Sequence, residues 1–281
     1  MPNAAIRSTE RQFTDLISAA RQGLPVDIHW YRLIGSRPEN YGRIEDLWEE
    51  EFDGLIVTGT EPRTDELSDE PFWPAFTKTV DWAAKHTIST IWSCLASHAA
   101  VLHLDGVQRQ KHDEKIFGVF TSTKAIEHDL LYNLMSWSVP HARWNDLRES
   151  DLLTHNYLVL SKSKEAGVET FIKKVNRSLF MFIQSHPEYD SGALGREYRR
   201  DIARFQMGQQ TSYPKVPANY FDIQSTTELE EIRRIESTKH ELDVIDNAQL
   251  LNDWKSVSVQ LYRNWLTYLS IQRAQLSPWS I

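Results

Sequence analysis

Residues 88–106 read ISTIWSCLASHAAVLHLDG, a short apolar segment, then Cys94, then a second apolar segment of helical length. The segment ISTIWS is typical of a strand, and residues 95–104 are typical of a helix that Gly106 ends. A residue at such a strand-to-helix turn projects from the edge of a sheet. The stretch therefore predicts an α/β fold with Cys94 at the carboxyl end of a strand.

The sequence on either side repeats this alternation of strand and helix patterns. Residues 53–59 (DGLIVTG) form a compact apolar run that ends in glycine, as in a strand buried on both faces of a parallel sheet. A helix is expected to begin near Ser68, with Pro71 in its first turn. Residues 179–183 (LFMFI) predict another strand. We therefore expect an α/β fold with a mostly parallel sheet flanked by helices.

Segments nearer the two ends follow the same periodicities. Residues 9–22 predict an amphipathic helix, and residues 26–33 (VDIHWYRL) predict a strand because Val26, Ile28 and Trp30 alternate with polar residues. The stretch 222–248 is charged, and we expect either an exposed helix or a surface insertion there. Apolar residues recur at helical spacing in 254–271, which predicts a helix near 250–272 that packs on the domain.

Composition limits the classes of protein to which the chain can belong. Its 281 residues suit one α/β domain spanning 1–281 better than two smaller ones. A formal net charge of -8 argues against partners that present phosphates, which excludes nucleic acid and anionic membranes. The sequence contains no apolar run of about 20 residues, and residues 1–12 lack the apolar core of a signal peptide. We therefore expect a cytoplasmic protein.

Cys94 is the single cysteine, so an intrachain disulfide is excluded. A lone cysteine can be a small buried apolar residue, or it can be a nucleophile where the fold brings a histidine to it. Here the following helix places its positive N-terminal end at the sulfur, which favours the thiolate. Trp92 and Ala96 stand where a nucleophile elbow usually has glycines. The turn alone therefore leaves both interpretations open.

The tripeptide His186-Pro187-Glu188 follows the strand at 179–183. Residues two apart in an extended segment point the same way. Glu188 can then hydrogen-bond one nitrogen of the imidazole while the other nitrogen faces the sulfur of Cys94. Carboxyl ends of parallel strands meet at one sheet edge, where ligands bind in open α/β sheets. The pattern predicts a nucleophile (Cys94), a base (His186) and an orienting carboxylate (Glu188).

Other chemistry is not indicated by the sequence. The remaining histidines lack the spacing of H-E-x-x-H, so we expect no metal site. Neither G-x-G-x-x-G nor G-x-x-x-x-G-K-[ST] occurs, so no nucleotide cofactor is expected.

Several stretches together resemble the homoserine O-acyltransferases of the transsuccinylase type. The motifs run in order through nearly the whole chain: residues 52–59 (FDGLIVTG), 89–91, Cys94, 114–120 (EKIFGVF), 185–190 (SHPEYD), 217–221 (PANYF) and 264–266 (NWL). The resemblance implies a class I glutamine amidotransferase-like fold. It also implies transfer of a succinyl or acetyl group from coenzyme A to the hydroxyl of homoserine, a step towards methionine.

The resemblance also implies roles for single residues. Cys94 would carry the acyl group as a thioester, with His186 as the base and Glu188 as its partner. Lys115 and Arg200 match family positions that hold the amino-acid substrate. The N–H groups of Leu95 and of the Gly59-Thr60 loop would stabilise the oxyanion. No cofactor would be bound permanently, acyl-CoA would be a co-substrate, and the family suggests a homodimer.

Two positions differ from the family and bear on specificity. Arg63 lies in the loop after Gly59, where the family has a glycine or a glutamate. It can pair with a carboxylate on the acyl group and so favour succinyl over acetyl, or it can be a solvated loop residue. The family motif His-Ser-Arg-Tyr reads His141-Ala142-Arg143-Trp144 here. A serine hydroxyl is thereby lost, and sites that hydrogen-bond a polar group discriminate by such contacts. A related hydroxy amino acid such as serine stays an alternative acceptor.

Two other functions stay open from the residues themselves. A glutamine amidotransferase-like hydrolase shares the Cys…His-Pro-Glu arrangement, and it would release ammonia from glutamine. A non-catalytic relative would bind a ligand or partner and would have an unreactive Cys94.

Overall fold

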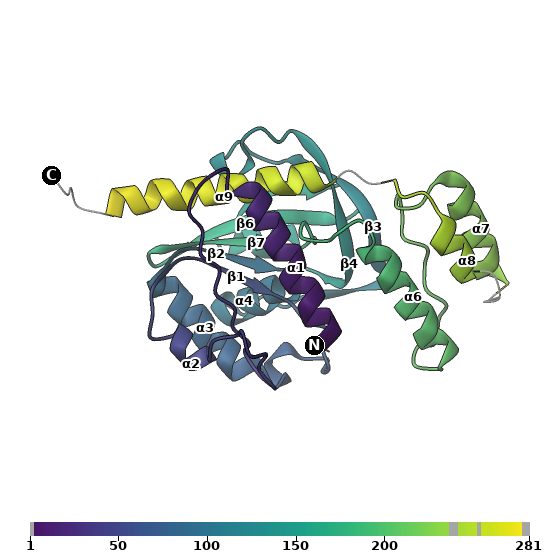
Figure 1. Ribbon diagram of the computed structural model, residues 1–281, viewed down its shortest axis with the longest axis horizontal. Coiled ribbons are helices and arrows are strands. Elements are labelled where there is room, and N and C mark those ends of the chain that lie inside the picture. Colours follow the sequence, from purple (N-terminus) through teal and green to yellow (C-terminus); the bar gives the residue numbers. More distant parts are fainter. Residues whose placement is uncertain (1–2, 236–240, 252–253, 277–281) are drawn as a thin grey trace.

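A seven-stranded sheet lies between two layers of helices in the computed structural model, which describes residues 3–235, 241–251 and 254–276 (Figure 1). The strands are β1 (Phe52–Thr58), β2 (Thr87–Ser93), β3 (Gln110–Lys124), β4 (Ser136–Asp146), β5 (Leu158–Ser163), β6 (Gly167–Val175) and β7 (Ser178–Ile183). The α-helices are α1 (Asn3–Ala20), α2 (Ile44–Leu47), α3 (Trp73–His86), α4 (Leu95–Asp105), α5 (Glu149–Thr154), α6 (Ala193–Gln206), α7 (Ile223–Arg234), α8 (Glu241–Asn247) and α9 (Trp254–Leu276). Two short 3-10 helices, η1 (Leu67–Asp69) and η2 (Asp129–Leu131), complete them.

The order of strands in the sheet is β1-β2-β7-β6-β5-β3-β4. The pairs β1–β2 and β2–β7 are parallel, and the other pairs are antiparallel. The predicted α/β class is therefore confirmed, with a sheet that is mixed: its parallel part is the half that carries β1, β2 and β7. Within that half the carboxyl ends of the strands share one edge, so Cys94 and His186 follow neighbouring strands there.

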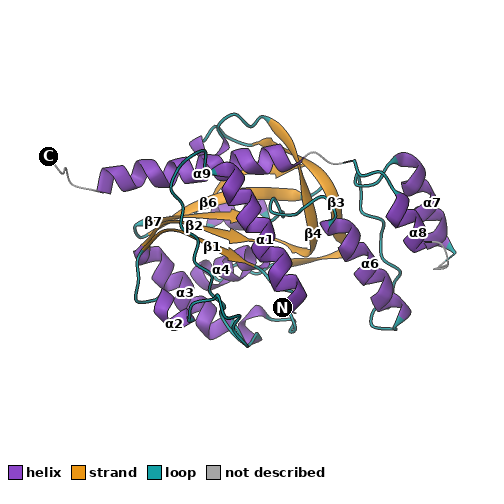
Figure 2. Ribbon diagram, viewed as in Figure 1, coloured by secondary structure: helices purple, strands orange, loops and turns teal. Residues whose placement is uncertain are grey.

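Side chains of the central strands alternate between two apolar layers. In β2, Trp92 packs with α3 and α4 on one face, and Ile91 packs with α1 and α9 on the other. Figure 2 shows the helices on both sides of the orange strands. Strands covered on both faces lose the apolar–polar alternation of a surface strand. That burial accounts for the continuous apolar runs in the sequence.

The predicted helices, and the predicted strands other than 26–33, are found with shifted ends. The first helix begins earlier than expected, at Asn3. The helix expected near Ser68 starts at Trp73 instead, with Pro74 rather than Pro71 in its first turn, because residues 67–69 form the 3-10 helix η1. Proline is tolerated in either first turn, since the N–H it lacks has no intrahelical acceptor there. Sequence alone therefore could not choose between the two.

The segment 26–33 was predicted as a strand, and this prediction is wrong in one respect. The segment is extended, but within the described residues it forms no ladder with the sheet, and its one bridge joins Tyr31 to Gly42. Its apolar alternation is present: Val26 and Trp30 pack towards α1 and α9, whereas Tyr31 and Leu33 pack towards α2 and α3. The side-chain pattern of a strand is thus present without strand pairing.

The carboxyl third of the chain extends the domain to one side. α6, α7 and α8 form a separate apolar cluster with Phe117 and Val119 of β3 (Figure 1). The charged stretch 222–248 contains α7 and α8, and its residues 236–240 lie outside the described part. α9 crosses back over the sheet. Among the residues described, no helix combines the length and the apolar character required to cross a bilayer.

Candidate active site

Cys94 occupies the turn between β2 and α4, as the sequence predicts. Its backbone has φ 51° and ψ -117°, and the residue precedes the first turn of α4. Its N–H donates to the carbonyl of Ile183 at 2.7 Å, which ties the turn to the end of β7. An L-residue with positive φ is strained, and such residues cluster at functional sites. The side chain is half-buried, so the sulfur is held at the sheet edge without being sealed off.

His186 and Glu188 are placed by the chain that leaves β7. The His186 N–H donates to the carbonyl of Pro140 at 2.8 Å, which fixes this loop against β4. His186 Nδ1 lies 2.8 Å from Oε1 of Glu188, as the two-residue spacing predicts. The other ring nitrogen is thereby left for Cys94, whose charge acts on the imidazole. Tyr189 stacks on the imidazole with ring centroids 4.2 Å apart.

The charge of this histidine is set by two opposing effects. Burial disfavours the imidazolium and by itself would lower the pKa of His186. The negative charges of Cys94 and Glu188, with the hydrogen bond to Glu188, outweigh burial and hold the pKa of His186 well above its usual value. The arrangement therefore favours the charged imidazolium form of His186. A cation beside a cysteine sulfur favours the thiolate, which is the nucleophilic form.

The loop after β1 meets the first turn of α4. A Cβ atom added at Gly59 would lie 2.9 Å from the backbone nitrogen of Leu95, so only glycine leaves this N–H uncovered. The first N–H groups of a helix have no acceptor within the helix. Farther along the loop, Glu61 forms a two-pronged ion pair with Arg204 of α6 at 2.6 and 2.8 Å. The loop that carries Thr60 is therefore fixed at both ends, beside a free helix terminus.

Lys115 and Arg200 are brought together, although 85 residues separate them in the sequence. Lys115 Nζ donates to Asp201 Oδ2 at 2.7 Å and to Glu197 Oε2 at 3.3 Å. Arg200 donates to the same two carboxylates, at 3.0 Å to Asp201 and 3.3 Å to Glu197. Tyr189 donates from its hydroxyl to the other oxygen of Glu197 at 2.5 Å. The cluster is therefore connected to His186 through the stacked Tyr189 ring.

Glu197 and Asp201 were missed in the sequence. They lie at i and i+4 on α6 and share one face of that helix. In the sequence they resemble solvated charges, but they are nearly buried, with side chains 16% and 10% exposed. Nearly buried carboxylates are a signal of function only after the fold is known. The cluster combines two cations with two anions, which suits a ligand that carries both charges, such as an amino acid.

A buried polar layer on β4 lies behind the loop that carries His186. Arg143 contacts Asp146 at 3.0 Å and also donates to the carbonyls of Asn145 and Ala166. Burial lowers the pKa of Arg143, an effect that the charges of Asp146 and Cys94 partly offset. Ala142 faces the opposite side, where it pairs with Phe117 and packs on the α6 cluster. The position that lacks the family's serine therefore lies on the side of Lys115 and Arg200.

Arg63 is placed differently from the other predicted substrate-binding residues. Its side chain is exposed, and its backbone N–H donates to the buried carboxylate of Glu70. It lines a cavity together with Thr60 and Leu95. Within the described residues, no group of three or more His, Cys, Asp or Glu side chains could hold a metal ion.

Comparison with known proteins identifies what the chain is similar to. A model of the family described as "HTS: Homoserine O-succinyltransferase" matches residues 1–276. The homoserine O-succinyltransferase of Rhodopseudomonas palustris is 39% identical over 96% of this chain and 86% of its own length. The enzyme of the same name from Methylorubrum extorquens is 38% identical over 96% of this chain and 85% of its own. The resemblance predicted from the motifs is thus confirmed.

The fold also has a counterpart among solved structures. A glutamine amidotransferase from Methylobacillus flagellatus superimposes with a TM-score of 0.51, over 92% of this chain and 88% of its own. Its sequence is only 10% identical, so the likeness concerns the fold alone. The expected class I glutamine amidotransferase-like fold is confirmed.

Proposed function

The chain belongs to the homoserine O-succinyltransferase family, and on that premise we propose that it moves a succinyl group from coenzyme A to the hydroxyl of homoserine. The observation that carries the proposal is the position of His186, whose Nδ1 is hydrogen-bonded to Glu188 and whose pKa is raised by the charge of Cys94. Such a relay suits transfer in two steps through a thioester on Cys94. The reaction would take place in the cytoplasm, in a homodimer.

In the first step, the Cys94 thiolate attacks the thioester carbonyl of succinyl-CoA. The oxyanion that forms is stabilised by the N–H groups of Leu95 and Thr60, an effect worth roughly 3–4 kcal/mol per donor. The coenzyme A sulfur then leaves and takes the proton of the His186 imidazolium. One thioester replaces another, so the step is close to isoenergetic, and the histidine becomes neutral when the second substrate needs a base.

In the second step, the neutral His186 takes the proton of the homoserine hydroxyl. The hydroxyl oxygen attacks the acyl carbon, the Cys94 sulfur leaves as a thiolate, and the ester is released. The imidazolium–thiolate pair is thereby restored. Glu188 keeps the imidazole oriented through both transfers by holding Nδ1.

The cluster on α6 is the proposed site for the amino-acid substrate. Arg200 and Lys115 would bind its carboxylate, and Glu197 would bind its ammonium group. These residues lie on the side of His186 where Tyr189 connects the two groups. Arg63 lines the same cavity as Thr60, and there it would pair with the free carboxylate of the succinyl group.

The test is intact-protein mass spectrometry after brief incubation with succinyl-CoA or acetyl-CoA. We expect a succinyl adduct, its absence in Cys94→Ala, and its loss when homoserine is added. Serine in place of homoserine tests the alternative acceptor. A protein that forms no adduct with either donor but releases ammonia from glutamine would show that the chain is a hydrolase instead.

A further inference from the structure

A fully buried carboxylate that the proposed mechanism does not use lies one strand away from the chain that carries His186. Glu169 belongs to β6 and is 0% exposed. β6 pairs with β7, the strand from which the chain continues to His186. Burial of a charged carboxylate is costly unless hydrogen bonds replace the water that it loses. The partners of Glu169 therefore show what the fold gains from a carboxylate at this position.

Three hydroxyl groups take the place of water around Glu169. Ser161 of β5 donates to Oε2 at 2.6 Å, and Thr170 donates to the same oxygen. Ser185 donates to the other oxygen, Oε1, at 2.6 Å. Ser161 Oγ also accepts the N–H of Thr170 at 3.1 Å, so its own proton is directed at the carboxylate. The first two bonds stay within the sheet, whereas the third runs to the residue next to His186.

The direction of the Glu169 side chain results from an irregularity in the sheet. In the pairing of β5 with β6, Ser161 faces Thr170, and the next residue, Lys162, faces Val168. Glu169 is therefore the additional residue of a β-bulge. In a regular strand, neighbouring side chains point to opposite faces of the sheet, whereas here Glu169 and Thr170 are hydrogen-bonded to each other. Bulges re-aim side chains in this way and are frequent next to active sites.

Glu169 holds the chain between β7 and His186 at two consecutive residues. Its backbone carbonyl accepts the N–H of Gln184 at 2.9 Å, and its side chain accepts the hydroxyl of Ser185. The next residue, His186, is fixed by its own N–H to Pro140 at 2.8 Å. Of these three bonds, only that of Ser185 joins two side chains. It can therefore be removed by substitution without a change in the backbone.

From this geometry, we propose that Glu169 and Ser185 are positioning residues for acyl transfer, and that their hydrogen bond holds the chain in the orientation that aims the His186 imidazole at Cys94. The inference rests on the proposed function, in which His186 passes a proton in both steps. A misplacement of about 1 Å can lower a rate about 100-fold. Loss of the bond should lower kcat and leave KM unchanged, because neither residue belongs to the substrate cluster on α6.

The charge of Glu169 reaches a second group, which defines a different role to be separated from positioning. Burial lowers the pKa of Arg143, and the charges of Cys94 and Glu169 are among those that oppose this effect. A purely electrostatic role would run through Arg143 to Cys94 and would not need the bond to Ser185. Glu169→Gln separates the two roles, because the amide removes the charge but keeps an oxygen that can accept the Ser185 hydroxyl.

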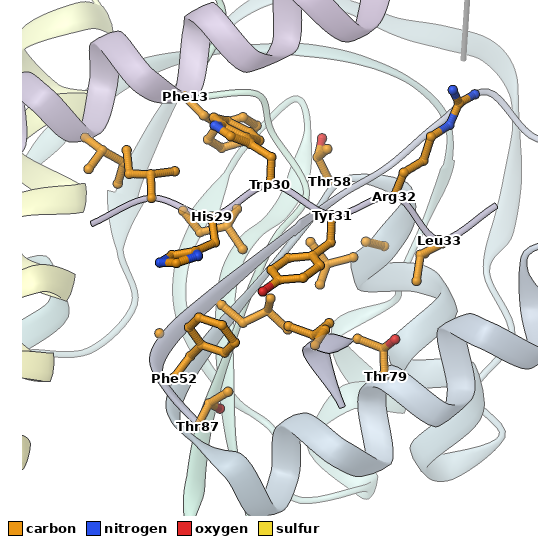
Figure 3. A pocket seen from close by; sticks show the side chains of 18 of the residues that line it. Phe13, His29, Trp30, Tyr31, Arg32, Leu33, Phe52, Thr58, Thr79 and Thr87 are labelled. Atoms are coloured by element: carbon orange, nitrogen blue, oxygen red, sulfur yellow. The ribbon is translucent and has the colours of Figure 1, made fainter. Parts of the chain in front are cut away.

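The test compares three serine-to-alanine variants in the full chain. Ser185→Ala removes the bond between Glu169 and the chain that leads to His186. Ser161→Ala removes a bond of the same length from the same carboxylate, but within the sheet. Ser178→Ala removes a hydroxyl bond to Thr87 at 2.7 Å, at the opposite end of β7, where Thr87 lines the cavity shown in Figure 3. All three serines are buried, so all three variants should unfold at lower urea concentration.

Only one of these variants should affect turnover strongly. We expect kcat to fall about 10- to 100-fold in Ser185→Ala, with KM for both substrates unchanged, and to stay within about twofold in Ser161→Ala and Ser178→Ala. Equal kcat values in the three variants would overturn the proposal. A fall of kcat in Glu169→Gln without one in Ser185→Ala would also overturn it, and would assign Glu169 the electrostatic role. If Ser185→Ala does not fold, Ser185→Gly removes the same hydroxyl.

Proton NMR provides a readout that needs no substrate. The Nδ1 proton of His186, which lies in a 2.8 Å hydrogen bond to Glu188, should give a resonance far downfield. We expect this resonance to shift or broaden in Ser185→Ala and to persist in Ser161→Ala. An unchanged resonance in Ser185→Ala would overturn the proposal, because the imidazole would then keep its place. The readout stays valid if the unmodified protein forms no succinyl adduct, so failure of the proposed function and failure of this inference are distinguishable.

Discussion

Glu188 provides the most direct control over the titration of His186. Its carboxylate is buried and accepts the hydrogen bond from Nδ1, and its charge is one of the two that raise the pKa of the imidazole above its usual value. Removing that charge without changing the size of the side chain separates orientation from electrostatics. Glutamine serves this purpose.

In Glu188→Gln, we expect the pKa of His186 to fall, because an anion beside the imidazolium is lost while burial remains. A fall of one pH unit corresponds to about 1.4 kcal/mol. NMR titration of the His186 ring should show the midpoint at lower pH, and kcat should drop at least about 100-fold. Glu49→Gln, at an exposed position, is the control. An unchanged midpoint in Glu188→Gln would contradict the electrostatic role.

Lys115 offers a test of the acceptor site alone. In Lys115→Met, a charged hydrogen-bond donor is lost, an effect of about 1.5–3 kcal/mol, so KM for homoserine should rise about 10- to 100-fold. Formation of the Cys94 adduct from succinyl-CoA should stay unchanged. Lys124→Met is a matched control, because the two lysine side chains are 11% and 12% exposed and both are ion-paired. If Lys115→Met instead loses formation of the Cys94 adduct to the same extent as it loses use of homoserine, Lys115 belongs to the donor site.

At the scale of elements, α9 connects parts of the fold that are distant in sequence. Trp254 donates to the carbonyl of Tyr189 at 2.8 Å, and Trp265 donates to the hydroxyl of Ser89 at 3.0 Å. The first bond supports the loop that carries His186 and Glu188 from outside the sheet. The second anchors the helix to β2. α9 thus contributes to the site through its neighbours.

This division of roles predicts different outcomes for the same substitution. Trp254→Phe and Trp265→Phe each remove one hydrogen bond from a buried indole, and each should lower the free energy of unfolding by about 1 kcal/mol or more. Only Trp254→Phe should also lower kcat, because Tyr189 stacks on His186. Urea unfolding and steady-state kinetics of the pair provide the comparison. If kcat falls equally in both, α9 acts through general stability.

The elements show how far sequence could predict this protein. The apolar runs at 53–59 and 179–183 correctly predicted β1 and β7, because strands that are buried on both faces are apolar along their whole length. The relation between His186 and Glu188 was also predicted, since a spacing of two in an extended chain determines direction. The strand predicted at 26–33 does not pair with the sheet, because pairing depends on a neighbour that the local pattern does not reveal. Glu197 was missed for the same reason: its partner Lys115 is close only in space.

At the scale of the whole molecule, stability should depend on a histidine outside the catalytic relay. His98 is buried in α4 and bonds Gln184 at 2.8 Å. Burial, together with the charge of Arg143, lowers the pKa of His98 to about 3 in the folded protein. In the unfolded chain the pKa of His98 is near 6.5. As pH falls, the unfolded chain therefore binds a proton at His98 before the folded protein does. Stability is therefore lost as pH falls from about 6.5 towards 3.

Replacing this residue should flatten the acid side of the stability curve. His98→Gln should be less stable at pH 7, where it loses packing. Between pH 7 and 4, however, its free energy of unfolding should fall by about 3 kcal/mol less than that of the unmodified protein. Urea titrations at pH 7, 6, 5 and 4 measure this difference. His29→Gln, at an exposed site, is the control. If the free energy of unfolding falls equally with pH in His98→Gln and in the unmodified protein, groups other than His98 cause the loss of stability in acid.

The backbone of Cys94 has a consequence for how this protein can change over time. At φ 51° and ψ -117°, its turn suits glycine better than any residue that bears a Cβ atom. A mutation to glycine would relax the turn and remove the sulfur at once. Selection for folding stability alone would thus replace Cys94 with glycine. The cysteine is retained only while selection also acts on formation of the product. Gene copies released from that demand should lose this cysteine early, while the rest of the sheet stays intact.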